Sequence, residues 1–143
     1  MAKILIVEDE KVIRNALRRL LERNDYQVEE ADSLTVAKEF DLPVHLDGAR
    51  FANAMVALGC SAAEMSWKAG VDAVSFGGTK NGCMGVEAVI FFDPKHAWEF
   101  ELRRKRGAHL FSKNRYLAAQ MLAYVTDDLW LDNARKANAN RAY

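Results

Sequence analysis

The sequence has few cysteines and no surplus of charge. Cys60 and Cys83 are the two cysteines among 143 residues, and their spacing fits no metal-binding motif. Lys and Arg total 20, as do Asp and Glu, so no global field attracts nucleic acid or an anionic membrane. No membrane-length apolar run and no signal-peptide pattern stands in the sequence. We therefore expect a cytoplasmic protein with neither nucleic-acid nor membrane partners.

Linker-like composition is absent as well. The chain has no repeat, low-complexity tract or Ser/Pro-rich segment, and hydrophobic residues make up 50% of it. That content suffices for a substantial core. A locally basic run, RRKR at 103–106, is best explained as a helix end, where cations favour the C-terminal dipole. We expect residues 1–143 to form a single domain.

Hydrophobic patterns predict about five strands. A continuous apolar run such as AKILIVE at 2–8 is typical of a strand in a buried parallel sheet. The other predicted strands are QVEEA at 27–31, LPVHLDG at 42–48, VDAVSF at 71–76 and GVEAVIFFD at 85–93. Only a short turn separates the last two, which predicts an antiparallel pair.

Helical patterns alternate with these strands. Apolar residues recur on one face from Lys11 to about Arg23, and SAAE at 61–64 is a capping box that predicts a helix ending near Gly70. A long pattern from Ser112 predicts a C-terminal helix of around twenty-five residues. The fold class is therefore α/β: a three-layer, flavodoxin-like, doubly wound sandwich with a mostly parallel sheet whose last strand is antiparallel. The apolar face of the long helix predicts self-association, as a homodimer or a domain swap.

The first part of the chain carries one family resemblance. ILIVEDE at 4–10, VIRNALRRLLER at 12–23 and YQVEEADS at 26–33 are similar to the start of a response-regulator receiver domain of the sigma-54 activator type. The resemblance covers residues 1–41 and implies a magnesium site at Glu8 and Asp9, because hard oxygen ligands suit that ion. The later receiver residues have no convincing counterparts here.

The rest of the chain, residues 42–143, carries another. HLDGARFANAMVALG at 45–59, DAVSFGGTKNG at 72–82 and the segment 101–135 resemble the central part of a pyridoxal-phosphate-dependent threonine aldolase. The resemblance implies that Lys80 is the catalytic lysine bound to the cofactor aldehyde and that Asp47 pairs with the pyridine nitrogen. Arg50 would hold a substrate carboxylate. His45 would flank the cofactor ring, or would be a packed, hydrogen-bonded histidine.

Simpler interpretations stand beside these roles. Lys80 is alternatively a solvated residue inherited from a parent enzyme, and Asp47 a turn residue after a strand. The aldolase family's glycine-rich phosphate-binding segment and its C-terminal small domain have no counterparts in this sequence.

Three hypotheses for the function follow. The preferred one is a recombined or engineered fold chimera, joined near residue 42, that is inactive and needs no cofactor. The alternatives are a residual pyridoxal-phosphate lyase that cleaves β-hydroxy amino acids to glycine and an aldehyde, and a receiver-like module that uses magnesium.

Overall fold

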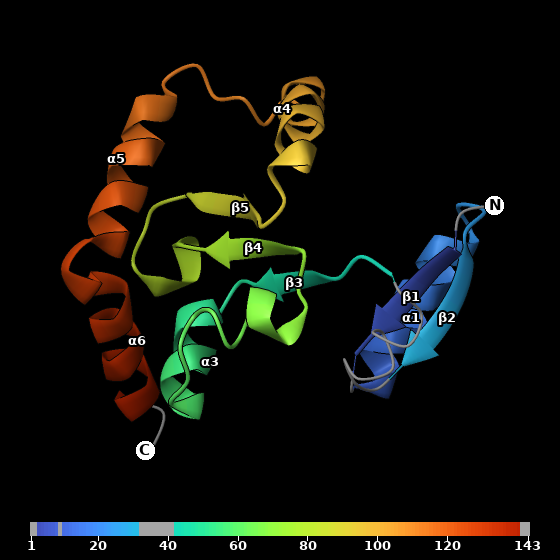
Figure 1. The fold of residues 1–143 in the computed structure, drawn as a ribbon, viewed down its shortest axis with the longest axis horizontal. Coiled ribbons are helices and arrows are strands. Elements are labelled where there is room, and N and C mark those ends of the chain that lie inside the picture. Colours follow the sequence, from blue (N-terminus) through green and yellow to red (C-terminus); the bar gives the residue numbers. More distant parts are fainter. Residues whose placement is uncertain (1–2, 9, 32–41, 141–143) are drawn as a thin grey trace. The chain divides into compact units, whose positions relative to one another are not determined.

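The computed structural model describes residues 3–8, 10–31 and 42–140. The chain divides into two compact units, Met1–Val44 and His45–Tyr143, whose elements are labelled in Figure 1. The described part of the first unit is a strand–helix–strand motif made of β1 (Lys3–Val7), α1 (Lys11–Glu22) and β2 (Gln27–Ala31). Its strands are parallel and in register from Lys3 opposite Gln27 to Val7 opposite Ala31.

Burial in the first unit is slight. Ile6 and Ala31, each 7% exposed, are its buried hydrophobic residues among those described. The predicted amphipathic helix is confirmed as α1, yet α1 has no buried residue, and Val12 is 74% exposed. The pattern of apolar residues therefore predicted the helix correctly, but the apolar side chains of this helix are not buried.

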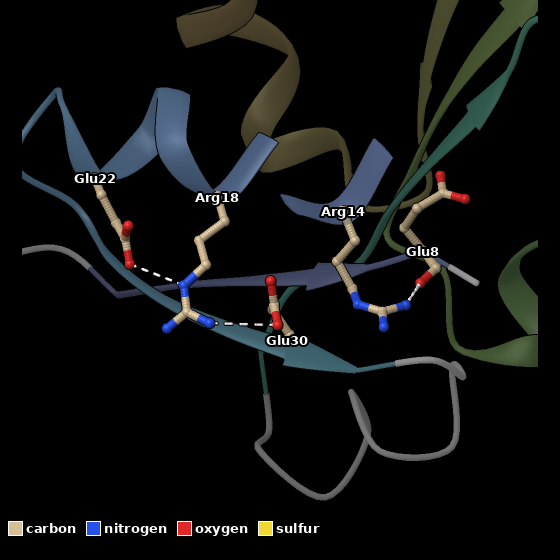
Figure 2. Close-up of polar contacts among 5 residues, drawn as sticks. All are labelled: Glu8, Arg14, Arg18, Glu22 and Glu30. Atoms are coloured by element: carbon tan, nitrogen blue, oxygen red, sulfur yellow. Dashed lines mark hydrogen bonds and ion pairs between the residues drawn. The ribbon is translucent and has the colours of Figure 1, made fainter. Parts of the chain in front are cut away.

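Polar contacts link α1 to both strands of this unit, as Figure 2 shows. The Arg18 guanidinium contacts Glu22 at 2.9 Å and Glu30 on β2 at 3.3 Å. Arg14 donates a hydrogen bond from its guanidinium to the backbone carbonyl oxygen of Glu8. Because the Arg18 side chain is partly exposed and solvent screens its charge, these ion pairs orient α1 more than they stabilise it.

The second unit is built on a three-stranded sheet with the order β3-β4-β5. Strand β3 (His45–Gly48) is parallel to β4 (Ala73–Gly77), and β4 is antiparallel to β5 (Glu87–Phe91). The predicted antiparallel last strand is therefore confirmed. The α-helices of this unit are α3 (Phe51–Leu58), α4 (Ala97–Arg106), α5 (Asn114–Val125) and α6 (Leu129–Ala139), and its short 3-10 helices are η1 (Trp67–Ala69), η2 (Thr79–Asn81), η3 (Pro94–His96) and η4 (Thr126–Asp128).

An aromatic cluster forms the core of this unit. The Phe76 ring on β4 lies 5.8 Å from Phe51 on α3, 5.8 Å from Tyr124 on α5 and 5.5 Å from Trp130 on α6, between ring centroids. Tilted and edge-to-face pairs at such distances are favourable beyond the area that they bury. One phenylalanine thus holds three helices against the sheet.

The predicted long C-terminal helical segment is confirmed, but it bends. Asp127 and Asp128 adopt left-handed backbone angles, with φ of 51° and 58°, and this bend separates α5 from α6. Aspartate tolerates that conformation better than most residues. Figure 1 shows the two helices following one another along one side of the sheet of the second unit.

Two structural predictions need correction. The strands form a two-stranded and a three-stranded sheet, so the single five-stranded flavodoxin-like sheet is not confirmed. Hydrophobic patterns identify extended segments, but the pairing of their edges depends on tertiary packing. The capping box at Ser61 forms, yet residues 62–66 are turns that lead into η1, and no α-helix follows.

Within the described ranges, no helix combines the length and the hydropathy that a membrane crossing needs. The cytoplasmic location stays a prediction.

Candidate active site

The first candidate residues lie on β3. His45 and Asp47 are alternate residues of this strand, so their side chains share one face of the sheet, and both are exposed. His45 Nε2 lies 2.8 Å from the Ser75 hydroxyl on β4. The alternative of a packed, hydrogen-bonded histidine holds in part: the hydrogen bond is present, but His45 is exposed rather than packed. Ser75 is a partner that the sequence did not indicate.

Asp47 forms a turn at the end of β3. Its Oδ1 accepts a hydrogen bond of 3.0 Å from the Ala49 amide, which is a common use of aspartate after a strand. The same carboxylate has a second oxygen that makes no hydrogen bond to another described residue. The turn role and a ligand role for Asp47 are therefore compatible.

The end of β3 and the turn that follows it are in close backbone contact with β4. A Cβ atom built on Gly77 would lie 2.5 Å from the Ala49 carbonyl oxygen, and one on Gly48 would lie 2.6 Å from the Ser75 carbonyl oxygen. Only glycine allows so close an approach of two backbones. This contact places the ends of both parallel strands, with Asp47 before one turn and Lys80 after the other, at the edge of the sheet where ligands commonly bind in α/β proteins.

Lys80 lies in the middle of η2, directly after β4. Its side chain is exposed and makes no hydrogen bond or ion pair with another described residue. The preceding residue, Thr79, is held by two bonds: its amide donates to Glu87 Oε1 at 3.2 Å and its hydroxyl to the Val86 carbonyl at 3.3 Å. The lysine amine is thus accessible on a turn whose backbone is fixed.

Behind Lys80 lies a buried polar network that the sequence analysis did not predict. Asn81, 7% exposed, donates from Nδ2 to the Tyr124 hydroxyl at 2.6 Å and to the Trp130 carbonyl at 2.8 Å. Tyr124, 2% exposed, donates in turn to the Gly77 carbonyl at 3.3 Å. Asn133 Nδ2 donates to the Asn81 carbonyl at 3.1 Å. The feature of the sequence that indicates this network is Asn81, the asparagine directly after Lys80.

Burial raises the pKa of the Tyr124 phenol, although its hydrogen bond from Asn81 acts in the opposite direction. Tyr124 therefore remains protonated at neutral pH and can donate to Gly77. Burial also raises the pKa of the Cys83 thiol, and the nearby Glu87 carboxylate adds to the rise. A thiol with a raised pKa is a poor nucleophile at neutral pH, so Cys83 is a weak candidate for catalysis.

Arg50 stands between β3 and α3. It is exposed and occupies the residue before the first turn of α3, with a φ of −125°. Its guanidinium makes no hydrogen bond or ion pair with the part of the chain that the structure describes. Arg50 therefore comes from the same β3 turn as Asp47 and can meet an anionic ligand there.

The predicted magnesium pair is only partly described. Glu8 follows β1, and its Oε1 accepts a 3.1 Å hydrogen bond from the Glu10 amide, while Asp9 lies outside the described residues. Among residues 3–8, 10–31 and 42–140, no group of three His, Cys, Asp or Glu side chains could hold a metal ion. The magnesium site at Glu8 and Asp9 stays a prediction.

Comparison with known proteins gives a consistent result for most of the chain. A family model described as "Beta-eliminating lyase" matches residues 27–143. The low specificity L-threonine aldolase of Pseudomonas aeruginosa (strain PAO1) is 48% identical over 114 residues, which are 79% of this chain and 33% of that protein. The protein with the same name from Pseudomonas sp. (strain NCIMB 10558) is 45% identical over 114 residues, with the same shares.

Two facts follow from these matches. The chain spans about a third (33%) of the length of the curated relatives it matches. The family match begins at residue 27, ahead of the predicted boundary between residues 41 and 42, and so it includes β2. The threonine-aldolase-like segment is confirmed, and the boundary between residues 41 and 42 stays a prediction.

Proposed function

Because this chain belongs to the beta-eliminating lyase family, we propose that it is a cofactor-binding segment of a threonine-aldolase-like lyase, with Lys80 as the residue that captures pyridoxal phosphate. The observation that carries this proposal is the backbone contact between Ala49, in the turn after β3, and Gly77, at the carboxyl end of the parallel strand β4. It brings a carboxylate, a guanidinium and a primary amine to one edge of the sheet.

The available donor groups fit the cofactor. Lys80 offers an exposed amine that can condense with an aldehyde and release one water molecule. Asp47 retains a carboxylate oxygen without a hydrogen bond to the described residues, and this oxygen can hold the proton of a pyridinium nitrogen. Pyridoxal phosphate, when bound, would supply an electron sink that weakens a bond at the α-carbon of an amino acid. This residue chemistry supports the cofactor implied by the resemblance.

The other two candidate residues, Arg50 and His45, would contact the substrate and the cofactor ring. Arg50 can bind a substrate carboxylate through two parallel hydrogen bonds. His45 is held by its Nε2 contact with Ser75 at 2.8 Å. Its ring would flank the cofactor ring, on the same face of the sheet as Asp47. The substrate class that we propose is a β-hydroxy amino acid, cleaved to glycine and an aldehyde.

The share of the relatives that this chain covers sets the expected strength of binding. Two thirds of each relative's length lies outside the 33% that is matched. We therefore expect weak, saturable cofactor capture by this chain, with slow turnover at most. Capture is the primary test, and release of glycine and acetaldehyde from threonine is the secondary one.

The test is to trap the cofactor on its lysine. The protein is mixed with increasing pyridoxal phosphate and reduced with borohydride, and the modified lysines are identified by peptide mass spectrometry. We expect saturable labelling at Lys80, its loss in Lys80→Ala, and its retention in the matched control Lys68→Ala, whose lysine is also exposed. Equal labelling of Lys68 and Lys80 in the unaltered protein would contradict the proposal.

The residues ahead of the family match support a second, separate proposal about origin. Residues 1–26 lie outside the matched range and contain β1 and α1, the strand and helix expected at the start of a receiver domain. Strand β2, which pairs in parallel with β1, lies inside the match. We propose that the chain joins a receiver-like start to the lyase segment and folds as one domain.

All three tryptophans, Trp67, Trp98 and Trp130, lie in the second unit. Thermal unfolding followed by their fluorescence should therefore coincide with unfolding followed by far-ultraviolet circular dichroism. Two separate transitions would count against a single domain.

A further inference from the structure

We propose that Tyr124 and Asn133, acting through Asn81, are positioning residues that hold the Lys80 turn in the conformation that captures the cofactor. The assignment of a cofactor to Lys80 rests on the proposed function. The claim that α5 and α6 hold the turn rests on hydrogen bonds alone. These two parts can be tested separately.

The contacts surround Lys80 on both sides. Before it, the Gly77 carbonyl accepts from Tyr124 at 3.3 Å. After it, the Asn81 side chain donates to Tyr124 at 2.6 Å and to the Trp130 carbonyl at 2.8 Å. The Tyr124 hydroxyl thus accepts from one end of the turn and donates to the other. The Tyr124 side chain therefore fixes the distance between Gly77 and Asn81, which lie on either side of Lys80.

The turn also depends on its own backbone bonds. The amides of Asn81 and Cys83 both donate to the Gly78 carbonyl, at 3.0 and 3.1 Å. These two bonds close the loop in which Lys80 lies. Because they form within the loop itself, exchange of the two amide protons with solvent reports directly on whether the turn opens.

The bend in the C-terminal helical segment explains how two helices reach one turn. Tyr124 is near the end of α5, and Asn133 is near the start of α6. Between them, left-handed Asp127 and Asp128 change the direction of the chain. Figure 1 shows the carboxyl end of β4 directed toward this bend. The bend thus lies between the two helices whose side chains, Tyr124 and Asn133, both contact Asn81 of η2.

Gly82 completes the fit on the α6 side. It has a φ of 112°, and a Cβ there would lie 2.9 Å from Asn133 Nδ2. The glycine therefore permits both the backbone angle and the approach of the asparagine amide. Lys80 itself makes no such contact, which is the arrangement expected for a reactive side chain on a fixed support.

The test uses two variants and a matched control. Tyr124→Phe removes one hydroxyl, and Asn133→Ala removes the donor from the other helix. Tyr116→Phe is the control, because Tyr116 is also on α5 but its hydroxyl bonds with Arg115 at 3.3 Å. Each protein is checked for a folded tryptophan signal. Hydrogen exchange is then measured at the Asn81 and Cys83 amides, and the ratio of borohydride-trapped label on Lys80 to that on Lys68 is determined.

We expect exchange at both amides to rise about fivefold in Asn133→Ala, the factor that corresponds to one net hydrogen bond. In Tyr124→Phe, which removes two hydrogen bonds, it should rise by at least about fivefold. The Lys80 to Lys68 labelling ratio should fall by a similar factor, and Tyr116→Phe should change neither quantity. A purely structural role would lower the melting temperature and leave the labelling ratio of the folded protein unchanged.

The outcomes separate the two claims. If both variants remain folded and exchange at the two amides is unchanged, the positioning role is overturned. If Tyr124→Phe does not fold, Asn133→Ala decides the question. If the unaltered protein labels Lys68 and Lys80 equally, the proposed function fails, and the exchange measurement still decides whether Tyr124 and Asn133 hold the turn.

Discussion

Gly77 at the end of β4 is in backbone contact with Ala49 in the turn after β3. A Cβ on Gly77 would lie 2.5 Å from the Ala49 carbonyl oxygen and 2.8 Å from its Cα. The residues that flank these two positions are Asp47 on one side and Lys80 on the other. This approach of the β3 turn to the end of β4 is the structural basis of the candidate site.

Gly77→Ala should destabilise the second unit. The added methyl group overlaps backbone atoms that cannot move aside as a flexible side chain could, so we expect a loss of about 1–3 kcal/mol. Urea unfolding followed by tryptophan fluorescence measures it. Gly107→Ala is the control, because the nearest atom to its Cβ would be 3.3 Å away. Equal losses in the two variants would show that the contact with Ala49 is not the cause.

Glu64 should give the second unit a pH-dependent stability. Hydrogen bonds from the Ser61 hydroxyl and amide, at 2.6 and 2.9 Å, lower the Glu64 pKa from its ordinary value of 4.5. The unfolded chain then binds a proton at a higher pH than the folded one. This contribution is therefore present above pH 4.5 and is lost as the pH falls through the lowered value.

Glu64→Gln isolates this effect, because glutamine can accept the same hydrogen bonds without titrating. Chemical unfolding is measured from about pH 6 to about pH 3. We expect the unaltered protein to lose more stability over this range than the glutamine variant does. Parallel pH profiles for the two proteins would rule out a linkage through Glu64.

Self-association should depend on the exposed face of α5. Leu122 is 68% exposed and Val125, three residues further along the same face, is 46% exposed, and burying one such leucine contributes about 1.5–3 kcal/mol. Leu122→Glu should therefore raise the dissociation constant of a homodimer by at least about tenfold.

Light scattering over a concentration series measures this constant. Leu58→Glu, which alters another exposed leucine on α3, should leave it unchanged. A monomer at every concentration in the unaltered protein would remove the prediction of a homodimer or domain swap.

Local sequence patterns predicted the elements well where the signal itself is local. The strand segments, the α1 helix and the antiparallel pairing of β4 with β5 all follow from periodicity and turn length. The capping box at Ser61 also forms its three bonds with Glu64. Its failure to start an α-helix shows the limit: a cap satisfies terminal amides, but the following residues must also find a surface to pack on.

The sequence by itself determined the strand segments, most of the helices, and which residues could serve chemistry: Lys80 after two glycines, and Asp47 and Arg50 around the end of a strand. Only the tertiary structure decided that the strands form two sheets and that the turn after β3 touches the end of β4. It also decided that the Asn81 side chain donates a hydrogen bond to Tyr124, 43 residues further along the chain. The physical reason is the separation along the chain over which each kind of interaction acts. Periodicity and turn chemistry act between near neighbours, while sheet pairing and buried hydrogen bonds depend on packing between distant segments.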